Sequence, residues 1–175
     1  MKCIVLAGEE RSAADRRLSG LFREWVCGER DGIAAFDGGF CGGGGDILLT
    51  QARRVERLPR GGIIVFRESF SERCRVDAEV RCAAVVSAEN VLAVRLLSGM
   101  DAQTVTCGLS GKDTVTVTSF TGDAAMLALQ RSVVACSGRV VQPFELPVRL
   151  GGTCDRYAIM SLFAAKLLTG ELPRK

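Results

Sequence analysis

The stretch KCIVLAGEERSAADRRLSGLFREWV, residues 2–26, decides the fold that the sequence predicts. Lys2 to Ala7 form the short apolar run of a buried strand, and Gly8 to Arg11 form a turn. From Ser12 to Val26 the apolar side chains recur at steps of three and four residues, which indicates a helix with one buried face. These side chains are Leu18, Leu21, Phe22, Trp25 and Val26. A strand, a turn and a helix in this order open a parallel α/β fold, and in nucleotide enzymes the turn binds phosphate.

Continuous apolar runs predict further strands of a parallel sheet. They lie at 32–37, 46–50, 61–66, 82–87 and 102–109, and a short helix at 91–97 precedes the last of them. Because the runs do not alternate in polarity, we expect helices on both faces of the sheet. The connection 51–58 is short and basic, with room for only a turn or two of helix.

The apolar pattern changes to alternation after residue 113. Strands are predicted at 114–118, 132–136, 139–142 and 144–150, with helices over 122–131 and 155–168 and a tight turn at Ser137-Gly138. The predicted fold class is therefore α/β: a mostly parallel sheet flanked by helices, with an antiparallel strand meander in the C-terminal half. Residues 1–175 are predicted to form a single domain.

Composition excludes several classes of partner. Hydrophobic residues make up 47% of the chain, and the positive mean hydropathy of +0.20 is typical of a globular protein. The 23 basic and 20 acidic residues are interspersed, so no basic stripe for nucleic acid is formed. No apolar run approaches the roughly 20 residues that cross a bilayer, and the first residues lack the plan of a signal peptide. We therefore expect no nucleic-acid or membrane partner and a cytoplasmic location.

Eight cysteines and the absence of histidine limit the chemistry. Four cysteines, Cys3, Cys82, Cys107 and Cys136, fall in apolar strand-like runs, where a reduced thiol packs as a small hydrophobic group. No pair has Cys-x-x-Cys spacing, which argues against a zinc site. Without histidine, catalysis has to use carboxylates, lysine, cysteine or a borrowed group. The sequence predicts no metal site and no catalytic set.

Two glycine-containing segments resemble phosphate loops but stand in the wrong context. The run Gly38–Gly45 leads into a strand, whereas a phosphate loop leads into a helix, so a connection is favoured. The segment Gly108–Asp113 holds a Gly-Lys pair, but it precedes an alternating strand and lacks the required glycine spacing. We expect a turn there.

A candidate crevice is predicted at the carboxyl ends of the parallel strands, where ligands bind in open α/β sheets. Ser87, Glu89 and Asn90 follow the strand 82–87, and they either face a ligand or cap the next helix. The turn after the first strand supplies the other candidates, which are Gly8, Glu9, Arg11 and Ser12. Ser12 also fits a capping box with Asp15, three residues later.

Three longer segments carry a family resemblance. AVVSAENVLAVRLL (84–97), AQTVTCGLSGKDTVTVTS (102–119) and ELPVRLGGTCDRYAIMSLFAAKLLTG (145–170) resemble, in order and pattern, the second half of the central ATP-binding domain of the Mur ligases and folylpolyglutamate synthetases. CIVLAGEERSAADRRLSGLF (3–22) takes the place of that family's Gly-Thr-Asn-Gly-Lys-Thr loop and helix. GDILLTQ (45–51) takes the place of a strand ending in Thr-Asn. The resemblance implies a domain of the kind that joins a carboxylate to an amine through an acyl phosphate, with ATP and magnesium.

The departures from this family fall on the residues that would carry the reaction. Ser12 or Ala14 stands where the resemblance places the phosphate-loop lysine, and Ala13 or Asp15 stands at the magnesium-binding threonine. The family's closing Leu-Pro-Gly-x-His-Asn has become the segment 150–155, without its histidine. Because the lysine charge is lost and acidic residues stand beside the turn, we expect phosphate to be repelled and no cofactor to be bound.

Three functional hypotheses follow. The favoured one is a non-catalytic Mur-ligase-like domain that acts as a binding or assembly module for a small molecule or a protein, in the setting of bacterial cell-wall synthesis. The second is a small enzyme of altered chemistry that uses the strand-end crevice. The third is a subunit of a larger complex.

Overall fold

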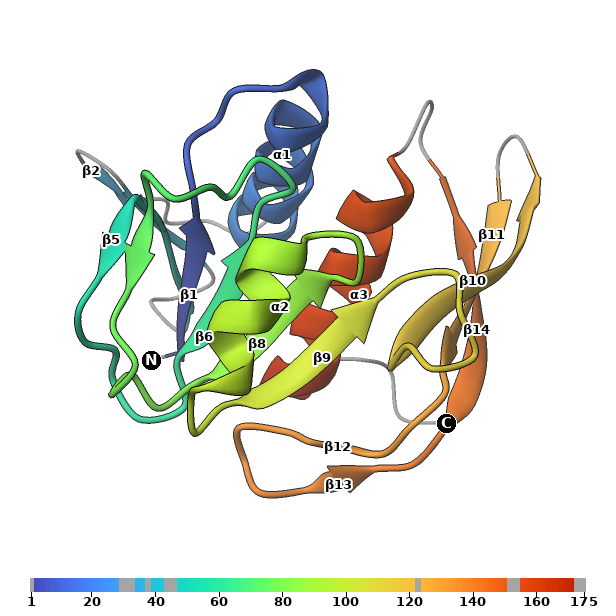
Figure 1. Ribbon diagram of the computed structural model, residues 1–175. Helices are drawn as coiled ribbons and strands as arrows, with labels where there is room; N and C mark the ends of the chain where they lie inside the picture. The colour runs from blue at the N-terminus through green and yellow to red at the C-terminus, as the bar shows by residue number, and fades with distance from the viewer. Residues whose placement is uncertain are drawn as a thin grey trace.

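The computed structural model describes residues 2–28, 34–36, 39–42, 47–121, 124–150 and 155–171 (Figure 1). The helices in these ranges are α1 (Ala13–Cys27), α2 (Val91–Ser98) and α3 (Arg156–Thr169). The large sheet contains β1 (Lys2–Ala7), β2 (Ala34–Phe36), β3 (Gly39–Gly42), β4 (Ile47–Ala52), β6 (Ile63–Phe66), β8 (Ala83–Ser87), β9 (Gln103–Cys107), β10 (Val115–Thr121), β11 (Ala124–Leu129) and β14 (Phe144–Arg149). Two small pairs accompany it: β5 (Arg54–Val55) with β7 (Arg75–Val76), and β12 (Val133–Val134) with β13 (Val140–Val141).

The strand order of the large sheet is β14-β11-β10-β9-β8-β6-β1-β4-β3-β2. Its centre, from β4 to β9, is parallel. At one end β11 runs antiparallel to β10 and to β14, and at the other β3 runs antiparallel to β4 and β2. The structure thus confirms the coarse fold class, a mixed α/β protein with a parallel-dominated sheet and antiparallel C-terminal strands. The antiparallel pairs at the β2 edge were not predicted.

Two apolar layers lie against the two faces of the sheet, because successive strand residues point to opposite sides. Ile4 and Leu6 of β1 face α1 and α3, whereas Cys3, Val5 and Ala7 face α2 and the β5–β7 pair. Figure 1 shows α2 in front of the sheet and α1 and α3 behind it.

The expectation of helices on both faces holds only in part. The connections 53–62 and 67–82 contain no helix, and the short strands β5 and β7 pair with each other over the sheet instead. The side chains of Val55 in β5 and Val76 in β7 point toward the sheet and are each only 4% exposed. Pro59 cannot donate a backbone hydrogen bond and is unfavourable inside a helix, so the first connection stays extended.

Two local predictions were wrong. Residues 122–131 were expected to be helical, but 124–129 form β11, paired on both sides with β10 and β14. Its alanines and leucines favour helix, and the two ladders override that weak preference. The glycine run was expected to be a connection, but Gly39–Gly42 form β3, which pairs with β4 through backbone groups that need no side chain. The rest of that run lies outside the described residues.

The predicted helix ends are largely confirmed. Ser12 caps α1, and Asp155 caps α3 through its side chain, which accepts a hydrogen bond from Ala158 N at 3.0 Å. Gly170 ends α3 with a φ of 77°, and Gly138, also at positive φ, closes the turn between β12 and β13. Within the described ranges, no helix is long and apolar enough to span a membrane.

Candidate functional site

The start of α1 is filled by a carboxylate of the chain itself. Asp15 Oδ2 accepts hydrogen bonds from Ser12 N at 2.9 Å and from Arg11 N at 3.1 Å, while Asp15 N donates to Ser12 Oγ at 3.0 Å. Burial alone would raise the pKa of Asp15, but these hydrogen bonds outweigh it and hold the pKa below its ordinary value. The place where a helix start would bind an external anion therefore already holds a negative charge.

A buried arginine, Arg67, lies behind this turn. Its side chain is fully buried, and its guanidinium donates from Nη1 to Asp15 O and from Nη2 to Gln51 Oε1, both at 3.0 Å. The same Nη1 lies 3.6 Å from Glu10 Oε2. Burial lowers the pKa of Arg67, and the carboxylates of Glu10 and Asp15 oppose that shift. The sequence argument missed this cation, although its signal was present as an arginine directly after the apolar strand 61–66.

Gly8 allows the turn to pass close to Arg67. Its φ is 121°, and a Cβ built on it would lie 3.3 Å from Arg67 Cβ and 3.4 Å from Cδ. The backbone needs glycine both for its conformation and for this approach. Gly8 therefore has a structural role that requires no phosphate.

Segment 67–70, which follows β6, lies between the two halves of the predicted crevice. On one side Ser69 Oγ donates to Glu9 O at 2.8 Å. On the other side Asn90 Nδ2 donates to the carbonyl groups of Arg67, Glu68 and Phe70 at 3.2–3.4 Å. The predicted residues thus fall into two groups at this sheet edge. The first group is Gly8, Glu9, Arg11 and Ser12, and the second is Ser87, Glu89 and Asn90.

Gly8, Glu9 and Arg11 of the first group line a hollow of about 440 Å³ beside the β1–α1 turn, whereas Ser12 does not. Its lining residues are Gly8, Glu9, Glu10, Arg11, Gln51, Ala52 and Arg53. Within it the Glu9 carboxylate is paired with Arg11 and, at 2.9 Å, with Arg53 Nη1. Both arginines that could bind an anion are therefore already paired with one carboxylate of the same turn, which offsets one of their two positive charges.

The second group is mainly structural. Asn90 caps α2, with Ala93 N donating to its Oδ1 at 3.0 Å, and buried Ser87 accepts a hydrogen bond from Glu89 N at 3.4 Å. The capping interpretation is thus confirmed for Asn90 alone, while the ligand interpretation stays a prediction. Glu89 is exposed.

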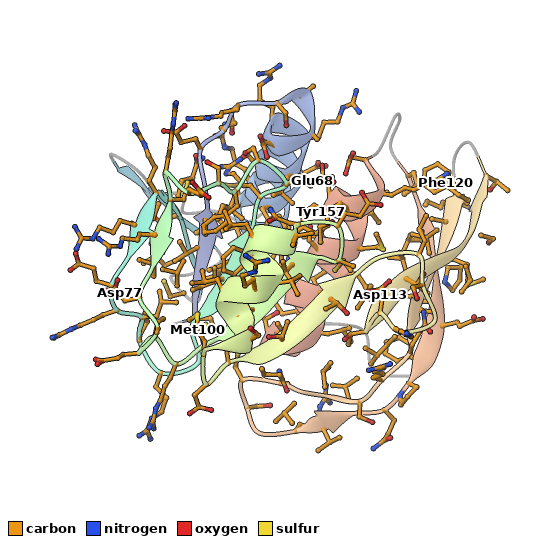
Figure 2. The ribbon with its side chains drawn as sticks, in the orientation of Figure 1. Glu68, Asp77, Met100, Asp113, Phe120 and Tyr157 are labelled. Atoms are coloured by element: carbon orange, nitrogen blue, oxygen red, sulfur yellow. The ribbon has the colours of Figure 1, made fainter. Side chains whose placement is uncertain are left out.

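Two titrating side chains stand beside this group, Glu68 and Tyr157 (Figure 2). Tyr157 is buried, its hydroxyl donates to Phe66 O, and burial raises its pKa well above the ordinary value. The pKa of Glu68 is also raised, first by loss of solvent around the carboxyl group and then by the negative charges of Asp155, Asp15 and Glu89. An anionic ligand at this edge would be repelled by the same carboxylates.

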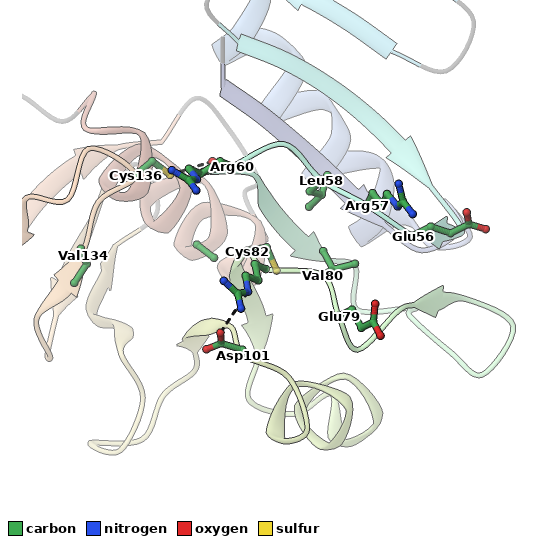
Figure 3. Close-up of a pocket in the computed structure, with 13 residues that line it drawn as sticks. Glu56, Arg57, Leu58, Arg60, Glu79, Val80, Cys82, Asp101, Val134 and Cys136 are labelled. Atoms are coloured by element: carbon green, nitrogen blue, oxygen red, sulfur yellow. Dashed lines mark hydrogen bonds and ion pairs between the residues drawn. The ribbon is translucent and has the colours of Figure 1, made fainter.

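The opposite edge of the sheet holds a larger hollow of about 710 Å³ (Figure 3). Arg57, Arg60 and Arg81 line it, but so do Glu56, Glu79 and Asp101, so its charges balance. Arg81 Nε lies 3.8 Å from Asp101 Oδ2. The hollow therefore favours neither anionic nor cationic ligands.

Two cysteines also line this hollow. Burial raises the pKa of Cys82 to about 11. Burial likewise raises the pKa of Cys136, against a lowering by Lys2, and the Cys136 thiol donates to Gly61 O at 3.2 Å. Both thiols are therefore protonated at neutral pH and are poor nucleophiles.

The expected burial of the cysteines is confirmed for two of four. Cys3 and Cys107 are buried in strands, but Cys82 is half-buried ahead of β8 and Cys136 is exposed after β12. The six cysteines whose side chains the structure describes are unpaired. Across the same described ranges, no group of three or more His, Cys, Asp or Glu side chains is arranged to hold a metal ion.

Comparison with known proteins assigns no family: no family model matches the chain, and no curated protein matches it at a significant level.

Proposed function

We propose that this chain is a non-catalytic Mur-ligase-like domain that acts as a binding or assembly module, with bacterial cell-wall synthesis as its setting. The order of strand, helix, strand, antiparallel meander and helix between residues 83 and 169 supports the proposed ancestry. The resemblance itself rests on pattern and order.

The observation that carries the non-catalytic part is the occupied start of α1. The Asp15 carboxylate accepts the amide hydrogens of Arg11 and Ser12, directly before α1, and Arg67 is used inside the chain, bonded to Asp15 O and Gln51. Phosphoryl transfer needs amides and a cation that are free to hold several negative charges. Here both are engaged by groups of the protein, and Glu9 and Glu10 add negative charge to the same turn.

Isothermal titration of the purified chain with ATP and magnesium tests this part. We expect no binding heat and no ADP formation. A double variant, Glu9→Gln with Glu10→Gln, removes two repelling charges but leaves Asp15 and Arg67 in place, so it should also fail to bind. Micromolar binding with turnover by the wild type would overturn the proposal. Binding by the double variant alone would show that simple repulsion, rather than the filled helix start, excludes the nucleotide.

A second candidate, an enzyme of altered chemistry at the same edge, is favoured by one observation. Glu68 has a raised pKa and stands beside Tyr157, which makes it the best-placed proton donor of this edge. Incubation with a panel of phosphorylated and carboxylated metabolites, followed by mass spectrometry, would reveal turnover. If turnover occurs and Glu68→Gln leaves its rate unchanged, this assignment of the acid is wrong.

A further inference from the structure

The parallel strands β1 and β4 are followed by connections that leave the sheet on opposite faces. After β1 the chain enters α1, whose Leu18 shares a buried cluster with Ile4 of β1. After β4 the connection 53–62 crosses the other face, where Val55 packs in one cluster with Val5. In open α/β sheets, ligands bind in the crevice beyond the strand ends at the point where the connections diverge in this way.

The hollow of about 440 Å³ beside the β1–α1 turn lies at this point of divergence. One side of it is lined by Gly8 to Arg11, directly after β1, and the other by Gln51 to Arg53, at the end of β4. Gly8 N donates to Ala52 O at 2.9 Å, so the two chains stay paired as far as the hollow. Small-molecule sites have volumes of about 300–1,000 Å³. The hollow thus has the position and the size of a small-molecule site.

The two strand ends supply an excess of positive charge and of hydrogen-bond donors. Arg11 and Arg53 share one carboxylate, that of Glu9, so one of their two charges is not offset. The Arg53 side chain is 73% exposed and has no other ion-pair partner within the described ranges. Gln51 Oε1 accepts from Arg67 Nη2, which fixes the amide and leaves Nε2 as a donor. This side of the hollow therefore suits a carboxylate group.

Glu10 brings a negative charge to the same hollow. Its Oε2 accepts from Ser19 Oγ at 2.7 Å and lies 3.6 Å from Arg67 Nη1. Its Oε1 makes no hydrogen bond to any residue that the structure describes, and a third of the side chain is exposed. An ammonium group is attracted to this oxygen, whereas a ligand with negative charge alone is repelled by it.

We propose that this hollow binds the head group of a small zwitterion of the α-amino-acid type. The ligand carboxylate pairs with Arg53 and meets the charge that Glu9 leaves unbalanced, and the ligand ammonium group pairs with Glu10. A zwitterion satisfies both sides of the hollow at once, whereas an anion also meets the carboxylates and a cation also meets the arginines. The inference rests on the binding role proposed above and names the class of small molecule.

L-Alanine and two analogues that each lack one of its charged groups provide the probes. Propionate lacks the ammonium group, and ethylamine lacks the carboxylate. At constant ionic strength we expect L-alanine to bind the full chain with a dissociation constant below about 50 mM, the weakest value that ordinary ligand efficiency predicts for a ligand of its size. It should bind at least about threefold more tightly than either analogue. In amide NMR spectra, binding should shift the signals of residues 8–11 and 51–53 and leave those of α2 unchanged.

Single variants separate the two halves of the proposed contact. Arg53→Gln should weaken L-alanine binding at least about threefold and leave ethylamine binding unchanged, because only the carboxylate loses its partner. Glu10→Gln should weaken L-alanine binding by a similar factor without weakening propionate binding. Arg54→Gln is the matched control, because Arg54 is also exposed and paired with a glutamate but does not line this hollow. It should leave L-alanine binding unchanged.

Several results would overturn the proposal. These are equal affinities for the three probes, no shift at residues 8–11 and 51–53 at about 50 mM L-alanine, or equal losses of affinity in Arg53→Gln and Arg54→Gln. The titration with ATP and magnesium is independent of this test. Nucleotide binding with turnover would remove the non-catalytic assignment, whereas failure of L-alanine to bind would remove only this class of ligand.

Discussion

Replacement of Gly8 by alanine tests the contact on which the candidate site depends. The backbone at Gly8 has a φ of 121°, which costs a residue with a side chain about 1–3 kcal/mol. The new methyl group would also lie 3.3 Å from Arg67 Cβ, a crowding that adds about 1 kcal/mol at the low end of overpacking costs. We expect Gly8→Ala to lower the free energy of unfolding by about 2–4 kcal/mol.

Gly20 offers a matched control for the same substitution. It lies inside α1, it is exposed, and a Cβ built on it meets no atom within 4 Å. Gly20→Ala should therefore raise the free energy of unfolding by about 0.5–1 kcal/mol, because alanine favours helix. Urea unfolding measures both changes, provided that the slope with denaturant stays constant.

A double-mutant cycle with Arg67→Ala tests the part of the Gly8 cost that comes from the outer Arg67 side chain. Alanine at position 67 keeps Cβ but lacks Cγ and Cδ, so in that background Gly8→Ala should keep its conformational cost and the contact with Cβ at 3.3 Å, and should lose the contact with Cδ at 3.4 Å, which is part of the crowding of about 1 kcal/mol. If Gly8→Ala is as stable as Gly20→Ala, or if the cycle shows no coupling with Arg67, the described packing of the turn against this arginine is wrong.

Four further predictions concern the same edge and the thiols. Ser12→Ala should lower the free energy of unfolding by about 0.5–2 kcal/mol in urea, because the α1 cap is lost. The lowered pKa of Asp15 means that its contribution to stability is present above its unfolded pKa and is lost as the pH falls through the folded value. Urea midpoints measured between neutral and acid pH should thus fall more steeply for the wild type than for Asp15→Asn. Gly108→Ala should lower the free energy of unfolding by about 1–3 kcal/mol or more, since its Cβ would lie 2.3 Å from Asp113 Oδ2; an unchanged urea midpoint would contradict that geometry. A thiol reagent should label exposed Cys136 in the native protein well before the buried cysteines, as mass spectrometry of peptides can show.

The sequence predicted the elements whose signals are local. The 2–26 unit has an apolar strand, a capping serine and a helical apolar face, and all three appear in β1, Ser12 and α1. The alternating run after residue 113 likewise became an antiparallel strand. In these segments the side-chain pattern alone predicts which face is buried.

The rest depended on neighbours that a single sequence does not reveal. The run AAMLAL at 124–129 favours helix by composition and became a strand only because β10 and β14 flank it. Gly39–Gly42 became a strand for the same reason, beside β4. At the site, the sequence placed Gly8, Ser87 and Asn90 at one edge, but it could not show that residues 67–70 lie between them or that Arg67 is buried there.

The position of α3 has a consequence for the order in which the chain can fold. Tyr157, near the start of this helix, donates to Phe66 O across 91 residues, and Lys2 Nζ donates to Thr169 O across 167. The apolar face of β6, β8, β9 and β10 behind the sheet is thus covered by α3, which follows all of these strands in the chain. Until α3 arrives, the nascent sheet has an open apolar surface, and chaperone capture or aggregation competes with folding. Truncation before residue 155 should therefore yield an insoluble product, even though every strand of the parallel centre is present.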